Sequence, residues 1–130
     1  MLPTGQVLMV GGFVSSSNGA LASTETYNPS SPTSFSPAAP MNAARGRHTA
    51  TNRTGGNYLL VAGGYDGSAT LSSAEIYAIA ANQFTPTAAM SVPRYRHTES
   101  LLPNGSVLLT GGDNGSGALS STELYIPFNN

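Results

Sequence analysis

Two short phrases recur three times along the chain, always in the same order. The first is an apolar run closed by paired glycines: VLMVGG at 7–12, LLVAGG at 59–64 and VLLTGG at 107–112. The second follows a Gly- and Ser-rich turn and reads STETY at 23–27, SAEIY at 73–77 and STELY at 121–125. The copies of the first phrase lie 52 and then 48 residues apart, a period typical of proteins whose repeating units bury their apolar faces against one another. The repeat therefore predicts a row of similar stacked units.

Each unit is expected to consist of short strands separated by turns. The glycine-pair strand is apolar throughout, as in strands buried on both faces, and is expected to lie innermost. The strand at 21–27 alternates, so that Glu25 and Tyr27 share one face. Flanking prolines limit the strand around Phe35 to an outer position, and a fourth strand is expected at about 46–53. No apolar run has helical spacing, so about ten strands and an all-β fold are predicted.

The combined features resemble the Kelch repeat. Paired glycines are followed by Glu-x-Tyr, an aromatic residue (Phe35 or Phe84), and then Met and an Arg-x-x-His stretch. Kelch repeats commonly have Trp where this chain has Phe, and each repeat of the family is one four-stranded antiparallel blade of a β-propeller. The resemblance implies one Kelch-repeat domain over 1–130, with blades at about 6–53 and 58–102 and a half blade at about 106–127.

Most of the polar residues that suggest chemistry recur at a fixed repeat position. A catalytic group is needed once, whereas a structural group is needed in every copy, so repetition favours a structural role. Each repeated Glu is expected to accept hydrogen bonds from the backbone or from an Arg of an adjacent blade. The residues assigned to the frame are Gly11, Gly12, Gly63, Gly64, Gly111, Gly112, Glu25, Glu75, Glu123, Tyr27, Tyr77, Tyr125, Arg47, Arg96, His48 and His97.

The sequence carries no enzyme signature. No Gly-x-Ser-x-Gly elbow and no phosphate-binding loop is present, and neither His48 nor His97 has a Cys, Asp or second His at ligand spacing. Some Kelch-like propellers are copper oxidases with a Cys-modified Tyr, and this chain has no Cys. We therefore expect a non-enzymatic protein without a catalytic residue, metal or cofactor.

Composition excludes some partners. Only 8% of the residues are charged and the net charge is -1, so no basic patch is available for nucleic acid. The longest apolar runs, such as 58–62, are far too short to span a membrane. All five cations are Arg, and Ser, Thr and Asn supply the polar surface, which favours a secreted or cell-surface bacterial parent. Residues 1–3 have no signal-peptide character.

Two and a half blades are too few for a closed propeller, which typically has four to eight. Leu2-Pro3-x-Gly5 aligns with Leu102-Pro103-x-Gly105, so the sequence begins within a motif. We expect a homodimer that forms a six-bladed ring in which two blades lack their outer strands. A short natural protein, an excised piece of a longer propeller and an engineered repeat assembly all remain open.

Residues that vary on the repeating frame are the candidates for ligand binding. They are Tyr65, Asp66, Asp113 and Tyr95, together with the longer loop Val14–Asn18. Tyr65 would stack on a ligand and the Asp side chains would accept hydrogen bonds, although Asp-Gly and Asn-Gly are also ordinary turn sequences. The preferred function is an interaction or scaffold module with a protein or glycan ligand. The alternative is a lectin-like carbohydrate-binding module, or a fragment of a larger carbohydrate-active Kelch enzyme.

Overall fold

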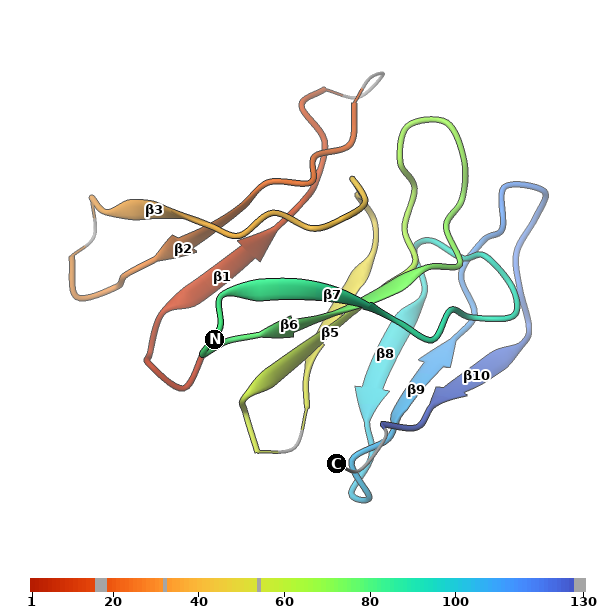
Figure 1. Ribbon diagram of the computed structural model, residues 1–130. Coiled ribbons are helices and arrows are strands. Elements are labelled where there is room, and N and C mark those ends of the chain that lie inside the picture. Colours follow the sequence, from red (N-terminus) through yellow and green to blue (C-terminus); the bar gives the residue numbers. More distant parts are fainter. Residues whose placement is uncertain (16–18, 32, 54, 128–130) are drawn as a thin grey trace.

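The structure is a computed structural model that describes residues 1–15, 19–31, 33–53 and 55–127. Within these residues it contains ten β-strands, no helix, and three antiparallel sheets of three, four and three strands. The predicted all-β class and strand number are therefore confirmed. No helix able to cross a membrane occurs among the described residues. Figure 1 shows the sheets in chain order as an open row rather than a closed ring.

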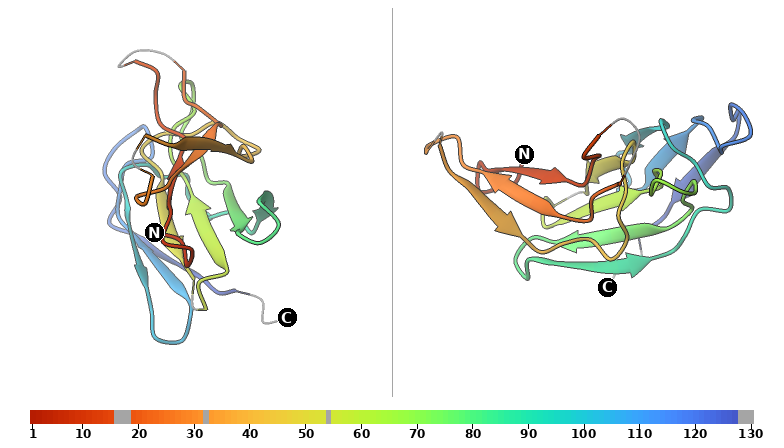
Figure 2. Two further views of the ribbon diagram at one scale, coloured as in Figure 1. Left: turned by 90° about the vertical axis from the view of Figure 1, so that its left-hand side faces the viewer. Right: turned by 90° about the horizontal axis from the view of Figure 1, so that it is seen from above.

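The strands of the three sheets follow one another along the chain. The first sheet contains β1 (Val7–Val10), β2 (Thr24–Tyr27) and β3 (Phe35–Ala38). The second contains β4 (Thr49–Asn52), β5 (Tyr58–Ala62), β6 (Ala74–Ala78) and β7 (Gln83–Thr87). The third contains β8 (Thr98–Leu101), β9 (Val107–Thr110) and β10 (Thr122–Tyr125). Seen from above in Figure 2, the second sheet lies between the other two.

The grouping of strands differs from the predicted blades at about 6–53, 58–102 and 106–127. Strand β4 pairs with β5, not with the first sheet, and β8 pairs with β9. The reason is the length of the connections. The turn from β4 to β5 is a tight hairpin, in which Arg53 N–H donates to Tyr58 O, whereas the segment 39–48 must first cross to the next sheet. The outcome is one four-stranded sheet between two three-stranded sheets.

The expectation that the glycine-pair strands lie innermost is wrong for the same reason. In the second sheet β5 is second in the order β4-β5-β6-β7, and in the third sheet β9 is second to β8. Strands β4 and β8 pack against each other across the two sheets, so the sheets converge at these edges. The segments Arg47-His48 and Arg96-His97 therefore lead into β4 and β8, the strands at these edges. The first sheet has no such strand among the described residues.

Two apolar clusters hold the row together. The first, between the first and second sheets, contains Met41, Leu59, Val61, Tyr77 and Phe84, with Leu8 and Val10 packed against it. The second, between the second and third sheets, contains Leu60, Ala62, Ala74, Val107 and Leu109. Strand β5 gives alternate residues to the two clusters, which is why it is apolar along its whole length.

The outward faces of the end sheets are not covered. Val61 and Phe84 in the middle sheet are 0% and 5% exposed, whereas the equivalent Met9 and Phe35 of the first sheet are 39% and 55% exposed. On the third sheet, Leu124 and Ile126 are 47% and 66% exposed. The same repeat position is thus core in the middle of the row and surface at its end.

The paired glycines end the β1, β5 and β9 strands, and in the first two sheets they contact the loop that leads to the next sheet. The N–H of Gly12 donates to Arg45 O and the N–H of Gly64 donates to Arg94 O, both at 2.9 Å. At Gly63 a Cβ would collide with the carbonyl oxygen of Arg94, and its φ of 62° lies in the left-handed region. Glycine is therefore required both by conformation and by the close approach of the loop.

Candidate functional site

The turns that follow the paired glycines all project from the same side of the row of sheets, at the top of Figure 1. We call this side the mouth. The residue after each glycine pair forms a β-bridge across its own turn. The bridges join Phe13 with Ala20, Tyr65 with Thr70, and Asp113 with Ala118. The repeating frame therefore presents one non-repeating side chain per sheet at the mouth.

A row of aromatic rings runs along the mouth. The ring centroids of Phe13 and Tyr65 lie 6.5 Å apart, and those of Tyr65 and Tyr95 lie 6.0 Å apart. The Arg47 guanidinium lies 5.4 Å from the Phe13 ring centroid, and that of Arg96 lies 5.5 Å from the centroid of Tyr95. Both Arg residues are exposed and have φ of 55°, a conformation that costs a non-glycine residue roughly 1–2 kcal/mol. We call these five residues the aromatic row.

The two Asp residues at the mouth are used largely by their own turns. Asp66 Oδ1 accepts hydrogen bonds from the N–H groups of Ser68 and Ala69, both at 2.7 Å. These bonds, that of Ala69 above all, hold the pKa of Asp66 below its ordinary value. Asp113 Oδ1 accepts from the N–H of Gly115 at 2.7 Å. One oxygen of each carboxylate is therefore committed to turn structure.

Of the four candidate ligand residues, three come together. Tyr95 and Asp113 exchange two backbone hydrogen bonds of 3.0 Å, and Tyr95 neighbours Tyr65 in the aromatic row. Asp66 lies in the turn that follows Tyr65. The candidate loop Val14–Asn18 lies partly outside the described residues, because 16–18 are not among them.

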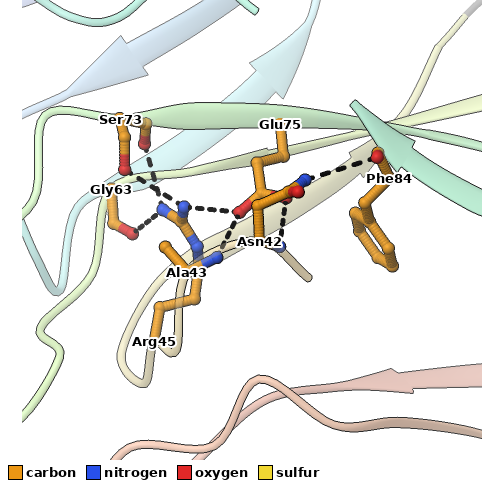
Figure 3. A network of polar contacts seen from close by, with 7 residues as sticks. All are labelled: Asn42, Ala43, Arg45, Gly63, Ser73, Glu75 and Phe84. Carbon is orange, nitrogen blue, oxygen red and sulfur yellow. Dashed lines mark hydrogen bonds and ion pairs between the residues drawn. The ribbon is translucent and has the colours of Figure 1, made fainter. Parts of the chain in front are cut away.

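A buried polar network joins the loop before β4 to the second sheet (Figure 3). Arg45 Nη1 donates to Gly63 O at 2.7 Å and to Ser73 O at 3.0 Å, and Nη2 donates to Ser73 Oγ at 3.1 Å. Nη2 also donates to Glu75 Oε1 at 2.9 Å, and the side chains of the pair are 0% and 2% exposed. The guanidinium therefore occupies a socket made of two carbonyls, a hydroxyl and a carboxylate.

The carboxylate of Glu75 is held by the backbone of the same loop. Its oxygens accept from the N–H groups of Asn42 at 2.8 Å and Ala43 at 3.1 Å, and from Asn42 Nδ2 at 2.8 Å. Burial acts to raise the pKa of Glu75, but these bonds and that of Arg45 outweigh it, so that the pKa is lowered. Both carboxylate oxygens and both terminal guanidinium nitrogens are thus hydrogen-bonded, and only the buried Arg45 Nε has no partner among the described residues. Such additional hydrogen bonds are what makes a buried ion pair tolerable.

The third sheet repeats the network. Arg94 donates to Gly111 O at 2.9 Å, to Ser121 O at 3.1 Å and to Glu123 Oε1 at 2.9 Å. Glu123 accepts from the N–H groups of Ser91 at 2.6 Å and Val92 at 3.0 Å. The first sheet differs: Glu25 is exposed and makes no hydrogen bond or ion pair with any described residue. The three repeated Glu residues therefore have two different environments.

The three repeated Tyr residues also differ in their contacts. Tyr77 packs on Phe84 with ring centroids 4.7 Å apart, and its hydroxyl donates to Asn82 Oδ1 at 2.9 Å. Tyr125 OH and Thr87 Oγ1 share a hydrogen bond of 2.9 Å between the third and second sheets. Tyr27 packs on Phe35 at 5.1 Å. Tyr77 and Tyr125 therefore lie at sheet junctions, whereas Tyr27 lies on the uncovered face of the first sheet.

A second polar cluster lies where β4 and β8 meet. Thr49 Oγ1 and His97 Nε2 are 2.6 Å apart, and Glu99 Oε1 lies 4.0 Å from the same nitrogen. The side chain of Glu99 is 1% exposed, and neither carboxylate oxygen has a hydrogen-bond partner of good geometry among the described residues. Glu99 stands where the first unit has Ala50, so this acid is specific to the β8 strand.

The cluster disfavours charge on its members. Burial raises the pKa of Glu99, and the hydroxyls of Thr49 and Thr51 oppose this only in part. Burial, followed by the charges of Arg94 and His48, lowers the pKa of His97 from 6.5 to about 4. Burial and the charge of Arg45 lower the pKa of His48 to about 4 as well. Both His residues are therefore neutral at pH 7.

No group of three or more His, Cys, Asp or Glu residues in the described part of the chain is placed to hold a metal ion. His97 and Glu99 supply two side chains, and the third neighbour is a hydroxyl. A structural zinc site usually has four protein ligands.

The sequence candidates omitted some of the residues that define these sites. Arg45 and Arg94 recur 49 residues apart, and this recurrence was the available signal for their sockets. Glu99 was visible as a departure from the repeat and as a residue two positions from His97, hence on the same face of a strand. Asn42 gave no signal, because its role depends on where the loop docks.

Comparison with known proteins agrees with this geometry. The Kelch motif matches residues 46–91, a span that contains all four strands of the second sheet and the loop that leaves it. No curated protein matches the sequence. The matched motif begins at residue 46, just before β4, and the hydrogen-bonded sheet also begins with β4. The chain therefore contains a Kelch motif at residues 46–91, and its three antiparallel sheets are consistent with blades of a partial propeller.

Proposed function

We propose that the chain is a non-enzymatic interaction module that completes a propeller by associating through its end sheets. The observation that carries this proposal is the contrast between equivalent positions. Phe84 is 5% exposed in the middle sheet and Phe35 is 55% exposed in the first. Exposed apolar faces and free sheet edges are features that native proteins normally cover with a partner.

A second copy of the chain is the simplest partner. Two copies would set the third sheet of one protomer against the first sheet of the other at two equivalent junctions. Six sheets would then form a ring, within the range of four to eight known for propellers. A net charge of -1 per chain offers little repulsion to such an association.

The test is the mass in solution. Light scattering at micromolar concentration is expected to give a dimer. Changing both Met9→Lys and Leu124→Lys places a charge on each end face and is expected to give the monomer mass. Val14→Lys is the matched control, because Val14 is 74% exposed but lies in a loop away from the sheet faces. A wild-type monomer at this concentration would refute self-association.

A second candidate function is ligand binding at the mouth, and the aromatic row favours it. Half-buried Tyr65 and Tyr95 with the exposed guanidinium groups of Arg47 and Arg96 suit a sugar ring or a peptide, because aromatic faces stack on apolar ligand faces and Arg donates hydrogen bonds. The aromatic row therefore supports the lectin-like alternative. A peptide or protein partner would bind at the same residues.

A glycan array and a peptide array test this candidate. Tyr65→Ala is expected to abolish binding of any hit. Tyr58→Ala is the control, because Tyr58 is an accessible aromatic residue with an Arg over its ring, Arg53 at 5.7 Å, but it lies at the β4–β5 hairpin, outside the aromatic row. If every hit is retained by Tyr65→Ala, the aromatic row is not the binding site.

A further inference from the structure

All three sheets carry the same receptor for an arginine side chain. It consists of the carbonyl of the first paired glycine, the carbonyl and hydroxyl of a Ser on the next strand segment, and the Glu two residues later. The three sets are Gly63, Ser73 and Glu75; Gly111, Ser121 and Glu123; and Gly11, Ser23 and Glu25. In the second and third sheets the receptor holds Arg45 and Arg94 with near-identical distances.

The receptor of the first sheet is formed but open. Met9 pairs with Glu25 in the same register in which Val61 pairs with Glu75 and Leu109 pairs with Glu123. Gly11 N–H donates to Ser23 O, as Gly63 N–H does to Ser73 O. Met9, Gly11, Leu21, Ser23 and Glu25 line an open pocket of about 240 Å³. We call this pocket the Glu25 socket.

The two filled sockets show what an occupant must contain. The segments are Met41-Asn42-Ala43-Ala44-Arg45 and Met90-Ser91-Val92-Pro93-Arg94. In each, the Met side chain enters the apolar cluster between two sheets, the next two N–H groups bind the Glu, and the Arg fills the receptor. The shared chemistry is Met-x-x-x-Arg with two free backbone donors after the Met.

The occupant must also be carried by another blade. The N–H of Arg45 donates to Leu21 O while its side chain reaches the second sheet, and Arg94 makes the same bond to Leu71 O. Each such segment thus joins two neighbouring sheets. Both segments are engaged in their own sockets, and residues 97–130 contain no Arg. A second copy therefore cannot supply this arginine in repeat register.

We propose that the Glu25 socket binds the Met-x-x-x-Arg segment of a further Kelch blade that lies outside these 130 residues. The inference rests on the proposed function in taking the first sheet as a docking face, and it names the contact that the partner makes. The exposed Val7 and Met9, 37% and 39% exposed, would receive the Met side chain, and Glu25 would receive two N–H groups and the guanidinium.

A labelled peptide with the sequence of residues 38–48 is the first probe, because it contains a segment already known to fit the equivalent receptor. We expect saturable binding by fluorescence anisotropy. Replacing the peptide's arginine that corresponds to Arg45 with Ala, or changing Glu25→Gln in the protein, is expected to weaken binding at least about tenfold. Combining the two changes should add little further loss, because they remove the same contact. Asp66→Asn is the control for general charge effects.

A tethered version tests the same contact without depending on a weak affinity. An extra copy of the sequence of residues 90–101 replaces Met1 and is joined directly to Leu2. This junction keeps the repeat register, because Leu2 corresponds to Leu102. The fusion is expected to melt at a higher temperature than the parent, and the gain should fall when the added arginine is changed to Ala. A fusion with no gain, together with no peptide binding at about 1 mM, would overturn the proposal.

The two proposals fail in different ways. A monomer that binds the peptide would refute the homodimer and support the Glu25 socket. A wild-type dimer whose monomeric Leu124→Lys variant ignores both the peptide and the added segment would support self-association and refute the socket. Leu124→Lys alone changes the third sheet and leaves the Glu25 socket intact, so loss of the dimer in that variant and loss of peptide binding in Glu25→Gln are separate readouts.

Discussion

Nη2 of Arg45 lies 2.9 Å from Oε1 of Glu75, between a loop that leaves the first sheet and a strand of the second. Removing the charge of Glu75 leaves the guanidinium buried without its counter-ion, which typically costs about 3–5 kcal/mol. Glu75→Gln is therefore expected to lower the melting temperature by roughly 10 °C or more. Differential scanning calorimetry measures the change.

The matched control is Glu25→Gln, which alters the same repeat position in an empty socket. Because Glu25 is exposed and has no described partner, its change is expected to stay within about 0.5 kcal/mol. Equal losses in the two variants would show that the Arg45–Glu75 pair is not what stabilises the junction.

Gly63→Ala and Gly111→Ala separate conformational strain from collision. Both glycines have positive φ, 62° and 66°, so each Ala costs roughly 1–2 kcal/mol. At Gly63 the new Cβ also meets the carbonyl oxygen of Arg94, and His97 Cε1 at 2.9 Å, whereas at Gly111 the nearest atom is Leu119 O at 3.5 Å. Urea denaturation should show a loss at Gly63 that is larger by about 1–3 kcal/mol. Similar losses would mean that the loop can move away from Gly63.

Acid is expected to destabilise the fold through His97 and His48. Their folded pKa values of about 4 lie below the ordinary 6.5, so the unfolded chain binds more protons between these values. Stability is therefore complete above pH 6.5 and is lost as the pH falls toward 4. Arg94, His48 and Glu99 are the ionisable groups that face His97. The urea midpoint should fall between pH 7 and pH 5, and His97→Gln should reduce that slope. An unchanged slope would place the pH dependence elsewhere.

Glu99 has the opposite linkage. Its folded pKa is raised above 4.5, so the folded state holds its proton more tightly and stability falls as the pH rises through the folded value. Glu99→Gln removes this loss and is expected to raise the melting temperature at pH 7 but not at pH 4. A lower melting temperature at pH 7 would indicate that the ionised carboxylate contributes a favourable contact.

The repeat alone was enough to predict strands, turns and stacking, because apolar runs and paired glycines are local signals. The pairing of β4 was not predicted, since the periodicity is the same whichever sheet receives the strand. The Gly55-Gly56 turn was the local sign of a hairpin with β5. Likewise, the recurrence of Arg and Glu did not reveal that Arg45 reaches the following sheet, because this depends on how the loop crosses between sheets.

The segments that fasten one sheet to the next all join neighbours in the chain, and this shapes how the molecule opens. The middle sheet is fastened on both sides, whereas each end sheet is fastened on one. In such nearest-neighbour systems local opening starts at the ends and moves inward. Amide hydrogens of β5 should therefore exchange with solvent most slowly, and those of β1 and β10 should exchange first.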